Sequence, residues 1–283
     1  MRVWLAAALL LLGTPGAAAA PSRVMSLNLC TDELVLALLP PARIAAVSRE
    51  ARDPAFSPFV AAARRVPVTR GSAEDVLAAH PDLVLAGSYT TPATRALLGR
   101  LGRRFVAVPP AETIAGIRAS TRAVARALGE PARGEALLMR MDAGIAALRR
   151  NPGPAVRVAA WDGGGFGAPR GSLFDTLITL TGAINVGADR ASRPGAALDG
   201  EMLLARAPAL ILAGGGSDDR DALRSAIARG PLLRRFWGEG RIIAIAPADY
   251  ACGTPWIADA ALRLRARLAA APHAPLPFAP GLR

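Results

Sequence analysis

A segment that occurs twice constrains the fold of this chain more than any other feature. Glu74–Gly87 reads EDVLAAHPDLVLAG and Glu201–Gly214 reads EMLLARAPALILAG, with eight of fourteen positions identical. Each copy predicts an apolar helix, a break at proline and a short aliphatic strand that ends at glycine. The copies lie too far apart for a solenoid, whose period is about 20–50 residues. We therefore expect two similar α/β lobes, each built around one helix-to-strand unit.

Short apolar strands alternate with helices around both copies, which is typical of parallel sheets. Between the predicted lobes, the stretch 114–150 is nearly all helical. Its second part has an apolar stripe at helical spacing, formed by Leu137, Leu138, Met141, Ile145 and Leu148. A helix of this length spans roughly 28 Å and can join two lobes as a stiff strut. The expected organisation is a signal peptide at 1–20, an N-terminal α/β lobe at 21–130, a connecting helix at 131–151, a C-terminal α/β lobe at 152–271 and a mobile tail at 272–283.

The first residues have the pattern of a secretory signal peptide. Arg2 supplies a positive charge, Val3–Leu12 is apolar, and Ala17–Ala20 provides small residues for cleavage. The apolar run is shorter than the ~20 residues that a bilayer span needs. No cysteine lies at the cleavage zone, so no lipid anchor is expected there. We expect a cleaved, soluble, periplasmic protein.

The formal net charge of +12 comes from arginine, because the sequence contains no lysine. The arginines are scattered singly or in pairs, with no basic run and few aromatic residues between them. Nucleic-acid-binding surfaces usually cluster such charges. The pattern therefore favours a solvated surface, with a few arginines that meet an anionic ligand.

Ligands of open α/β sheets bind beyond the carboxyl ends of the strands, which selects particular loops as the candidate site. Those loops hold an amide, five aromatic side chains and several arginines. The residues predicted to bind a ligand there are Asn28, Arg49, Arg70, Tyr89, Trp161, Phe166, Arg170, Tyr250 and Trp256. Aromatic faces with a few cations suit a large, flat or partly anionic small molecule. Core packing is the alternative role for Trp161 and Trp256.

Cys30 and Cys252 follow the first and the last predicted strand, so both are also placed at the ligand cleft. Three interpretations remain open. The two can form a disulfide between the lobes, which would clamp the cleft. One or both can contact a bound metal centre as thiolates. Both can also be buried, inert thiols.

Several kinds of site do not agree with the sequence. A bare zinc or manganese site needs three or four ligands, and the chain has two histidines, His80 and His273. The counterpart of His80 in the second copy is Ala207, which indicates a structural role. No histidine is placed to activate a cysteine or serine. Gly163–Ala168 matches a dinucleotide fingerprint only loosely, because no acidic residue follows at the required distance. We expect no catalytic residue, no cofactor and no metal held by the protein alone.

The opening RVMSLNLCTDELVLALLPPARIAAVS, the repeated segment, the central helix and the second lobe together resemble the periplasmic binding proteins of ABC importers for vitamin B12, ferric siderophores and haem. The likeness covers nearly all of the mature chain. It implies two Rossmann-like lobes with parallel sheets, joined by one long helix, with the ligand between the lobes. It also implies an exported monomer that delivers a metal chelate to an ABC transporter permease. A ferric siderophore is expected first, and cobalamin or haem next. An exported enzyme or a chelate sensor on the same fold is the alternative.

The resemblance also implies a role for the glutamate that begins each repeat. In that family one acidic residue on each lobe pairs with arginines of the permease, and Glu74 and Glu201 match those positions. Ser72 and Asp199 are the expected N-caps, which places both glutamates second in their helices. The alternative is that each glutamate only complements its helix dipole, an effect of ~0.3–1 kcal/mol.

Overall fold

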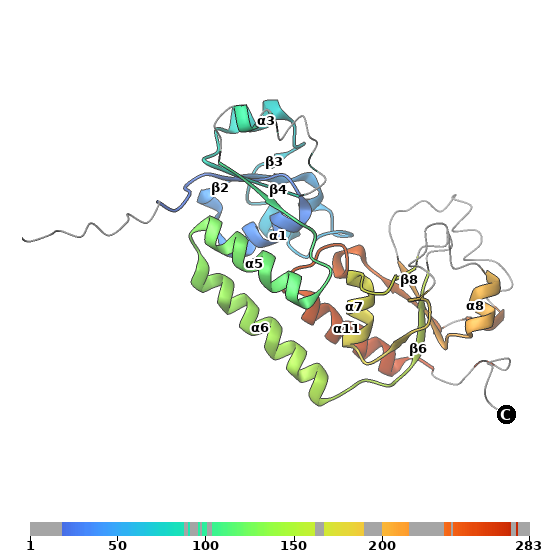
Figure 1. Cartoon of the computed structure of the whole chain (residues 1–283). Coiled ribbons are helices and arrows are strands. Elements are labelled where there is room, and N and C mark those ends of the chain that lie inside the picture. Colours follow the sequence, from blue (N-terminus) through green and yellow to red (C-terminus); the bar gives the residue numbers. More distant parts are fainter. Residues whose placement is uncertain are drawn as a thin grey trace, which may run out of the picture.

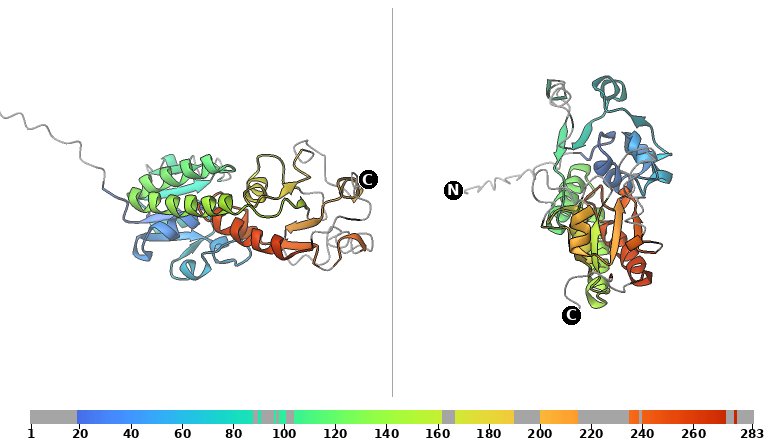
Figure 2. Two further views of the ribbon diagram at one scale, coloured as in Figure 1. Left: turned by 90° about the horizontal axis from the view of Figure 1, so that it is seen from below. Right: turned by 90° about the vertical axis from the view of Figure 1, so that its right-hand side faces the viewer.

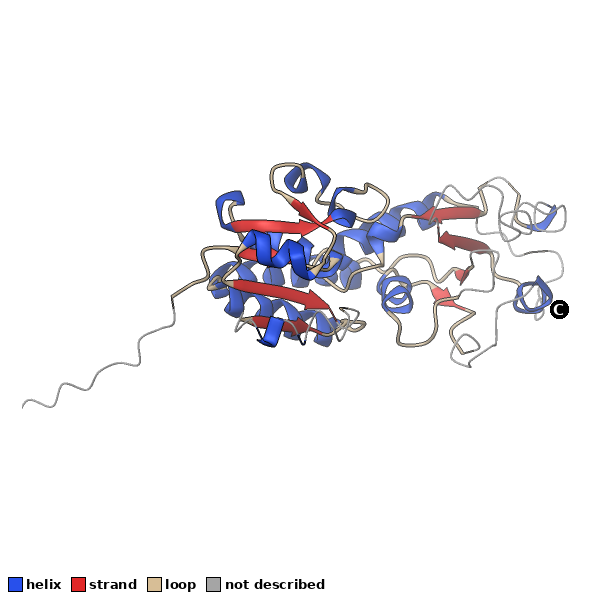
Figure 3. Cartoon of the chain, turned by 90° about the horizontal axis from the view of Figure 1, so that it is seen from above, coloured by secondary structure: helices blue, strands red, loops and turns tan. Residues whose placement is uncertain are grey.

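The structure is a computed structural model that describes residues 19–87, 90, 96, 98–100, 104–161, 167–189, 200–214, 235–238, 240–272 and 276. Two lobes lie one after the other along the molecule, and each contains one sheet (Figures 1 and 3). The predicted signal peptide falls almost wholly outside the described residues and stays a prediction. Within them, no helix is long and apolar enough to cross a bilayer.

In the part of the N-terminal lobe that the structure describes, five parallel strands lie in the order β3-β2-β1-β4-β5. Their bounds are β1 (Val24–Ser26), β2 (Ile44–Ser48), β3 (Val68–Thr69), β4 (Leu83–Gly87) and β5 (Phe105–Val108). The other elements of the lobe are α1 (Leu29–Leu38), η1 (Pro41–Arg43), η2 (Arg49–Arg52), α2 (Val60–Ala63) and α3 (Ala73–Ala79). All strand pairs are parallel, so the carboxyl ends of the strands share one edge.

Among its described residues, the C-terminal lobe contains four parallel strands in the order β7-β6-β8-β9. Their bounds are β6 (Arg157–Ala160), β7 (Ile184–Asn185), β8 (Leu210–Gly214) and β9 (Ile242–Ile245). The helical elements are α7 (Leu173–Leu180), α8 (Gly200–Arg206), η3 (Pro247–Asp249) and α11 (Ile257–Ala270). The predicted fold class, α/β with two parallel-sheet lobes, is confirmed.

The two copies of the repeated segment occupy equivalent places. Each forms a helix and a central strand, α3–β4 in one lobe and α8–β8 in the other. The chain turns between helix and strand at His80 (φ 45°) and Ala207 (φ 43°), both in the left-handed region. Side chains then alternate between the two faces of each sheet. Val84 and Ile211, for example, lie in the cluster on one face, while their neighbours along the strands lie in the main core of the lobe.

Two helices join the lobes, α5 (Ile114–Leu128) and α6 (Pro131–Arg150), and they pack side by side (Figures 1 and 2). With 20 residues, α6 is about 30 Å long and is the connecting helix expected from the sequence. Its Leu137 packs on the core of the N-terminal lobe, whereas Met141 lies in the core of the C-terminal lobe. In α5, Val124 lies in the core of the N-terminal lobe and Ile117 in the core of the C-terminal lobe. The connection is therefore packed into both lobes and resists bending.

Candidate functional site

A cavity of about 430 Å³ lies between the lobes, beyond the carboxyl ends of their strands. The N-terminal lobe contributes Asn28, Gly87 and the segment 108–112, which follows β5. The C-terminal lobe contributes the segments 169–174 and 250–253. Most of these residues are apolar, so a few polar side chains determine what the cavity can recognise.

Asn28 is held in place by the helix that it precedes. It is the N-cap of α1, and its Oδ1 accepts hydrogen bonds from the backbone N–H groups of Cys30 (3.0 Å) and Thr31 (3.4 Å). Its amide nitrogen lies against Gly87, where a Cβ atom would stand 2.8 Å from Nδ2. No residue in the described part of the chain accepts a hydrogen bond from Nδ2. Asn28 therefore presents a fixed amide donor at the cavity wall.

Tyr250 has the corresponding place in the other lobe. Its ring stacks on Phe174 with centroids 4.4 Å apart and an interplanar angle of 12°. Its hydroxyl lies against Gly214, where a Cβ atom would be 2.8 Å from the oxygen. Gly87 and Gly214 are equivalent positions of the repeat. The glycine that ends each copy thus makes room for one polar side chain that lines the shared cavity.

A second hollow of about 430 Å³ adjoins the first at Asn28, which lines both. It lies beyond β1, β2 and β3, and Arg49 and Arg70 border it. Both arginines are exposed, and neither forms an ion pair with a described residue. Asp75 fixes the loop by accepting hydrogen bonds from the Thr69 hydroxyl and the Arg70 backbone (both 2.8 Å), which lower its pKa. The hollow therefore places two positive charges and the carboxylate of Glu50 beside the cavity.

The other predicted site residues have different surroundings. Arg170 lines the cavity and is ion-paired with Asp189. Its Nε–H donates to Asp189 Oδ1 (2.9 Å), and this hydrogen bond raises the pKa of Arg170. Trp161 is 4% exposed and packs in the outer core of the C-terminal lobe, away from the residues that line the cavity. Trp256 packs on the core of the N-terminal lobe and meets Phe59 edge-on, with centroids 4.6 Å apart. Tyr89 and Phe166 lie outside the described residues.

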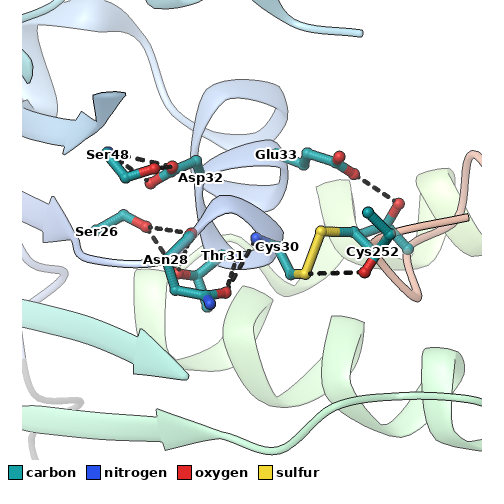
Figure 4. Close-up of a disulfide and its surroundings, with 10 residues drawn as sticks. Ser26, Asn28, Cys30, Thr31, Asp32, Glu33, Ser48 and Cys252 are labelled. Atoms are coloured by element: carbon teal, nitrogen blue, oxygen red, sulfur yellow. Dashed lines mark hydrogen bonds between the residues drawn. A yellow bond between two sulfur atoms is a disulfide. The ribbon is translucent and has the colours of Figure 1, made fainter. Parts of the chain in front are cut away.

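The structure brings together four of the predicted residues around the cavity: Asn28, Cys30, Arg170 and Tyr250. Cys252 stands directly behind that wall, because it forms a disulfide with Cys30 (Cα–Cα 5.0 Å; Figure 4). Of the three interpretations of the cysteines, the disulfide is the one found. It joins α1 of one lobe to the loop between η3 and α11 of the other.

The disulfide belongs to a continuous contact between the lobes, formed by the segment 247–256 against the N-terminal lobe and here named the interlobe seam. The Thr254 hydroxyl donates to Glu33 Oε2 at 2.8 Å, and the Ala248 N–H donates to the Ala55 carbonyl at 3.0 Å. Gly253 approaches the Ala111 carbonyl so closely that a Cβ atom would stand 1.7 Å from the oxygen. On the side where the disulfide lies, the interlobe seam fixes the distance between the lobes and so the width of the cavity.

Two adjacent buried carboxyl groups lie in α1, and one of them, Glu33, accepts the hydrogen bond from the seam. Glu33 is 2% exposed and Asp32 is fully buried. Asp32 accepts hydrogen bonds from the backbone N–H and the hydroxyl of Ser48. Burial raises the pKa of Asp32 to about 7 and that of Glu33 to about 8. Sequence reasoning missed this pair, although two acidic residues in an otherwise apolar helix are a usable signal for it.

The described residues contain no group of three or more His, Cys, Asp or Glu side chains that could hold a metal ion. The arrangement can bind a small molecule through apolar walls, a stacked aromatic pair and an amide donor. A metal that arrives inside its own chelate needs no protein ligands. These features suit a site that binds an organic ligand.

The two glutamates that begin the repeats lie at the surface. Glu74 is the second residue of α3 and Glu201 the second residue of α8, and both are exposed. The Ser72 hydroxyl caps α3 as predicted, whereas Asp199 lies outside the described residues. Helices α3 and α8 are on different lobes, and both are away from α6 (Figure 1).

The sequence pattern of a family described as periplasmic binding protein matches residues 24–245. The chain belongs to the periplasmic binding protein family. Proteins of this family are the substrate-binding components of ABC importers, which deliver ligands to a permease, and they are not enzymes. The family resemblance drawn from the sequence is confirmed. No protein with a curated description matches the sequence.

Solved structures resemble this periplasmic binding protein over most of their length. The periplasmic haem-binding protein RhuT from Roseiflexus sp. RS-1 is 25% identical, with a TM-score of 0.71 over 88% of this chain and 98% of that one. An ABC-type Fe³⁺-hydroxamate transport protein from Saccharomonospora viridis is 20% identical (TM-score 0.65; 88% and 93% covered). The vitamin B12-binding protein BtuF of Vibrio cholerae is 18% identical (TM-score 0.62; 88% and 97% covered). The last two likenesses support the fold alone.

Proposed function

We propose that this binding protein captures a metal chelate in the interlobe cavity and delivers it to an ABC permease. A ferric siderophore is the first expectation, and cobalamin or haem the next. One observation carries the proposal: both lobes contribute a polar side chain to one cavity, Asn28 and Tyr250, each set against the glycine that ends one copy of the repeat. A ligand that touches both side chains bridges the lobes, as the ligand of an importer receptor must.

The form of the cavity favours a chelate over a free ion. Its volume of about 430 Å³ lies within the range of small-molecule sites, roughly 300–1,000 Å³. Its apolar walls can enclose an organic ligand, and the described residues offer no preformed metal cage. The solved structure named as the periplasmic haem-binding protein RhuT agrees with this ligand class.

The charges beside the cavity favour an anionic chelate. Arg49 and Arg70 border the adjoining hollow with no ion-pair partner among the described residues, so they can meet an acidic arm of a ferric siderophore. The stacked pair of Phe174 and Tyr250 also suits a flat macrocycle, which keeps cobalamin and haem as the next candidates.

The proposal is tested by titrating the mature chain calorimetrically with ferrichrome, ferric enterobactin, cyanocobalamin and haemin. We expect one of them to bind one-to-one with a Kd that is micromolar or tighter. Tyr250→Ala should weaken that binding by at least about tenfold, or ~1.4 kcal/mol, because the stacked wall is lost. Met139→Ala changes an exposed side chain on α6 and serves as the control. Failure of all four chelates to bind, or equal affinity of the Tyr250 variant, would overturn the proposal.

We also propose that Glu74 and Glu201 dock the loaded protein on arginines of the permease. Both are exposed, and each begins a helix on a different lobe. The double variant Glu74→Arg/Glu201→Arg should abolish import while the affinity for the chelate stays unchanged. Glu135→Arg, an exposed reversal on α6, is the control. Normal import by the double variant would exclude the docking role.

A further inference from the structure

The disulfide lies in the wall of the ligand cavity. Cys30 lines the cavity beside Ala251 and Gly253, and its Sγ is 3.8 Å from the Ala251 carbonyl oxygen. Cys252 is only 7% exposed, whereas Cys30 is half-buried. A reagent that enters the cavity therefore meets the sulfur of Cys30 first. A ligand in the same place covers it.

The rest of the interlobe seam is held without covalent bonds. It consists mainly of the hydrogen bonds from Thr254 and Ala248 and of the edge-on contact between Trp256 and Phe59. All of them involve the segment 247–256, so they depend on the position of the segment that the disulfide anchors. The other connection between the lobes is made by α5 and α6, which are packed into both cores. Without the disulfide, α5 and α6 still connect the lobes firmly, whereas the interlobe seam is held by these few non-covalent contacts alone.

We propose that the Cys30–Cys252 disulfide is a redox-operated clamp on the ligand cavity, closed when oxidised and released by a dithiol reductant. In the oxidised chain the segment 247–256 stays against α1 and the cavity keeps its width. After reduction this segment separates from α1, and the cavity loses part of its wall. The effect on a bound chelate rests on the proposed function, whereas the release of the seam does not.

The course of thiol–disulfide exchange follows from the greater exposure of Cys30, whose sulfur a reductant reaches first. A thiolate of the reductant attacks Sγ of Cys30, and the electron pair of the S–S bond leaves with Sγ of Cys252, which takes up a proton. The second thiol of the reductant gives up its proton, attacks the reductant sulfur in the mixed disulfide and expels Cys30 as a thiolate. Two electrons pass from the reductant, now a disulfide, to the protein, now a dithiol.

A ligand and a reductant both approach the cavity wall at Cys30. Ligand binding and reduction of the disulfide must therefore be linked. A chelate that covers Cys30 slows the attack on its sulfur. Because linkage between binding equilibria is reciprocal, a chelate that binds the oxidised form more tightly also opposes reduction. The clamp therefore retains its ligand under oxidising conditions and releases it under reducing ones.

The test is amide hydrogen exchange of the mature chain, oxidised and then reduced with dithiothreitol, together with the variant Cys30→Ser/Cys252→Ser without reductant. Gallium(III)-desferrichrome is the ligand probe, because gallium does not change oxidation state when the thiol is added. The amides of α6 serve as the internal reference. We expect exchange in 250–256 to rise at least about tenfold in the reduced chain and in the variant, with α6 unchanged. The gallium chelate should leave the reduced form faster and should slow reduction of the oxidised one.

Equal exchange of 250–256 in both redox states would overturn the clamp. A rise that includes α6 would also overturn it, because the disulfide would then stabilise the whole fold. If exchange changes only at the seam but the oxidised chain binds no gallium chelate, the clamp stands and the proposed siderophore class fails. The two proposals can therefore fail separately.

Discussion

At the scale of single residues, Glu33 shows how a buried polar group can join two lobes. Its carboxyl group accepts a hydrogen bond across the interlobe seam from Thr254, and the side chain is 2% exposed. An ionised carboxylate in such surroundings is costly, and Asp32 beside it adds a second buried acid. Desolvation therefore favours the protonated forms and raises both pKa values.

The stability of the protein should fall as pH rises through the neutral range. The pKa of Glu33 is raised from 4.5 to about 8 and that of Asp32 from 3.8 to about 7, so the folded state holds these protons more tightly. The stabilisation is complete below pH 4 and is lost between pH 4 and 8. Each group contributes a slope of at most roughly 1.4 kcal/mol per pH unit. Urea unfolding at pH 5.5 and 8.5 measures the difference.

The variant Glu33→Gln keeps an acceptor for Thr254 but cannot ionise, so the slope of unfolding free energy against pH should become shallower. Glu74→Gln, which removes an exposed carboxylate, is the matched control and should leave the slope as it was. An identical slope in the Glu33 variant and the original chain would show that the carboxyl group is ionised in the fold.

The sequence predicted some side chains of the site better than others. Asn28 and Tyr250 follow strands and do line the cavity, because the carboxyl ends of parallel strands share one edge. Trp161 also follows a strand, yet its indole packs in the outer core with Trp237. The position of ligand sites at the carboxyl ends of strands identifies which residues are candidates. It does not say toward which face of the sheet a side chain points, because that depends on the pleat and on the residues packed against it. Sequence spacing could not supply that information.

At the scale of elements, the repeated segment predicted the fold correctly. In both copies the helix and strand propensities, the spacing of apolar residues and the turn residues indicate the same helix–strand unit. The helix–strand units α3–β4 and α8–β8 appear where expected, with left-handed turns at His80 and Ala207. The edge strand β7 was missed, since Ile184–Asn185 is too short to show a period. The disulfide of the seam was one of the three open interpretations, but its hydrogen bonds were missed, because 247–256 contacts residues about two hundred positions earlier.

The connecting helix α6 offers a matched pair of methionines that tests the packing of the strut. Met141 is 1% exposed and lies in the core of the C-terminal lobe, whereas Met139 is 65% exposed. Met141→Ala should lower the free energy of unfolding by about 2–5 kcal/mol, because it leaves a cavity in that core.

Met139→Ala should change the free energy of unfolding by less than about 0.5 kcal/mol. Chemical denaturation of both variants measures the two effects under the same conditions. Similar losses for both substitutions would mean that α6 is not seated on the core as described.

At the scale of the whole molecule, two connections hold the lobes on either side of one cavity. One connection is the helix pair α5 and α6, packed into both cores, and the other is the interlobe seam with its disulfide. A receptor built in this way can change its cavity only slightly while both connections hold. We therefore expect ligand recognition to depend on groups already in place, chiefly Asn28 and the stacked pair of Tyr250 and Phe174.

The most direct test of this account is anomalous X-ray diffraction from crystals of the mature chain grown with the chelate that titration selects. The account predicts one metal peak per chain inside the interlobe cavity, between Asn28 and Tyr250. A metal peak on the outer surface, or an empty cavity in a chain that binds the chelate in solution, would contradict it.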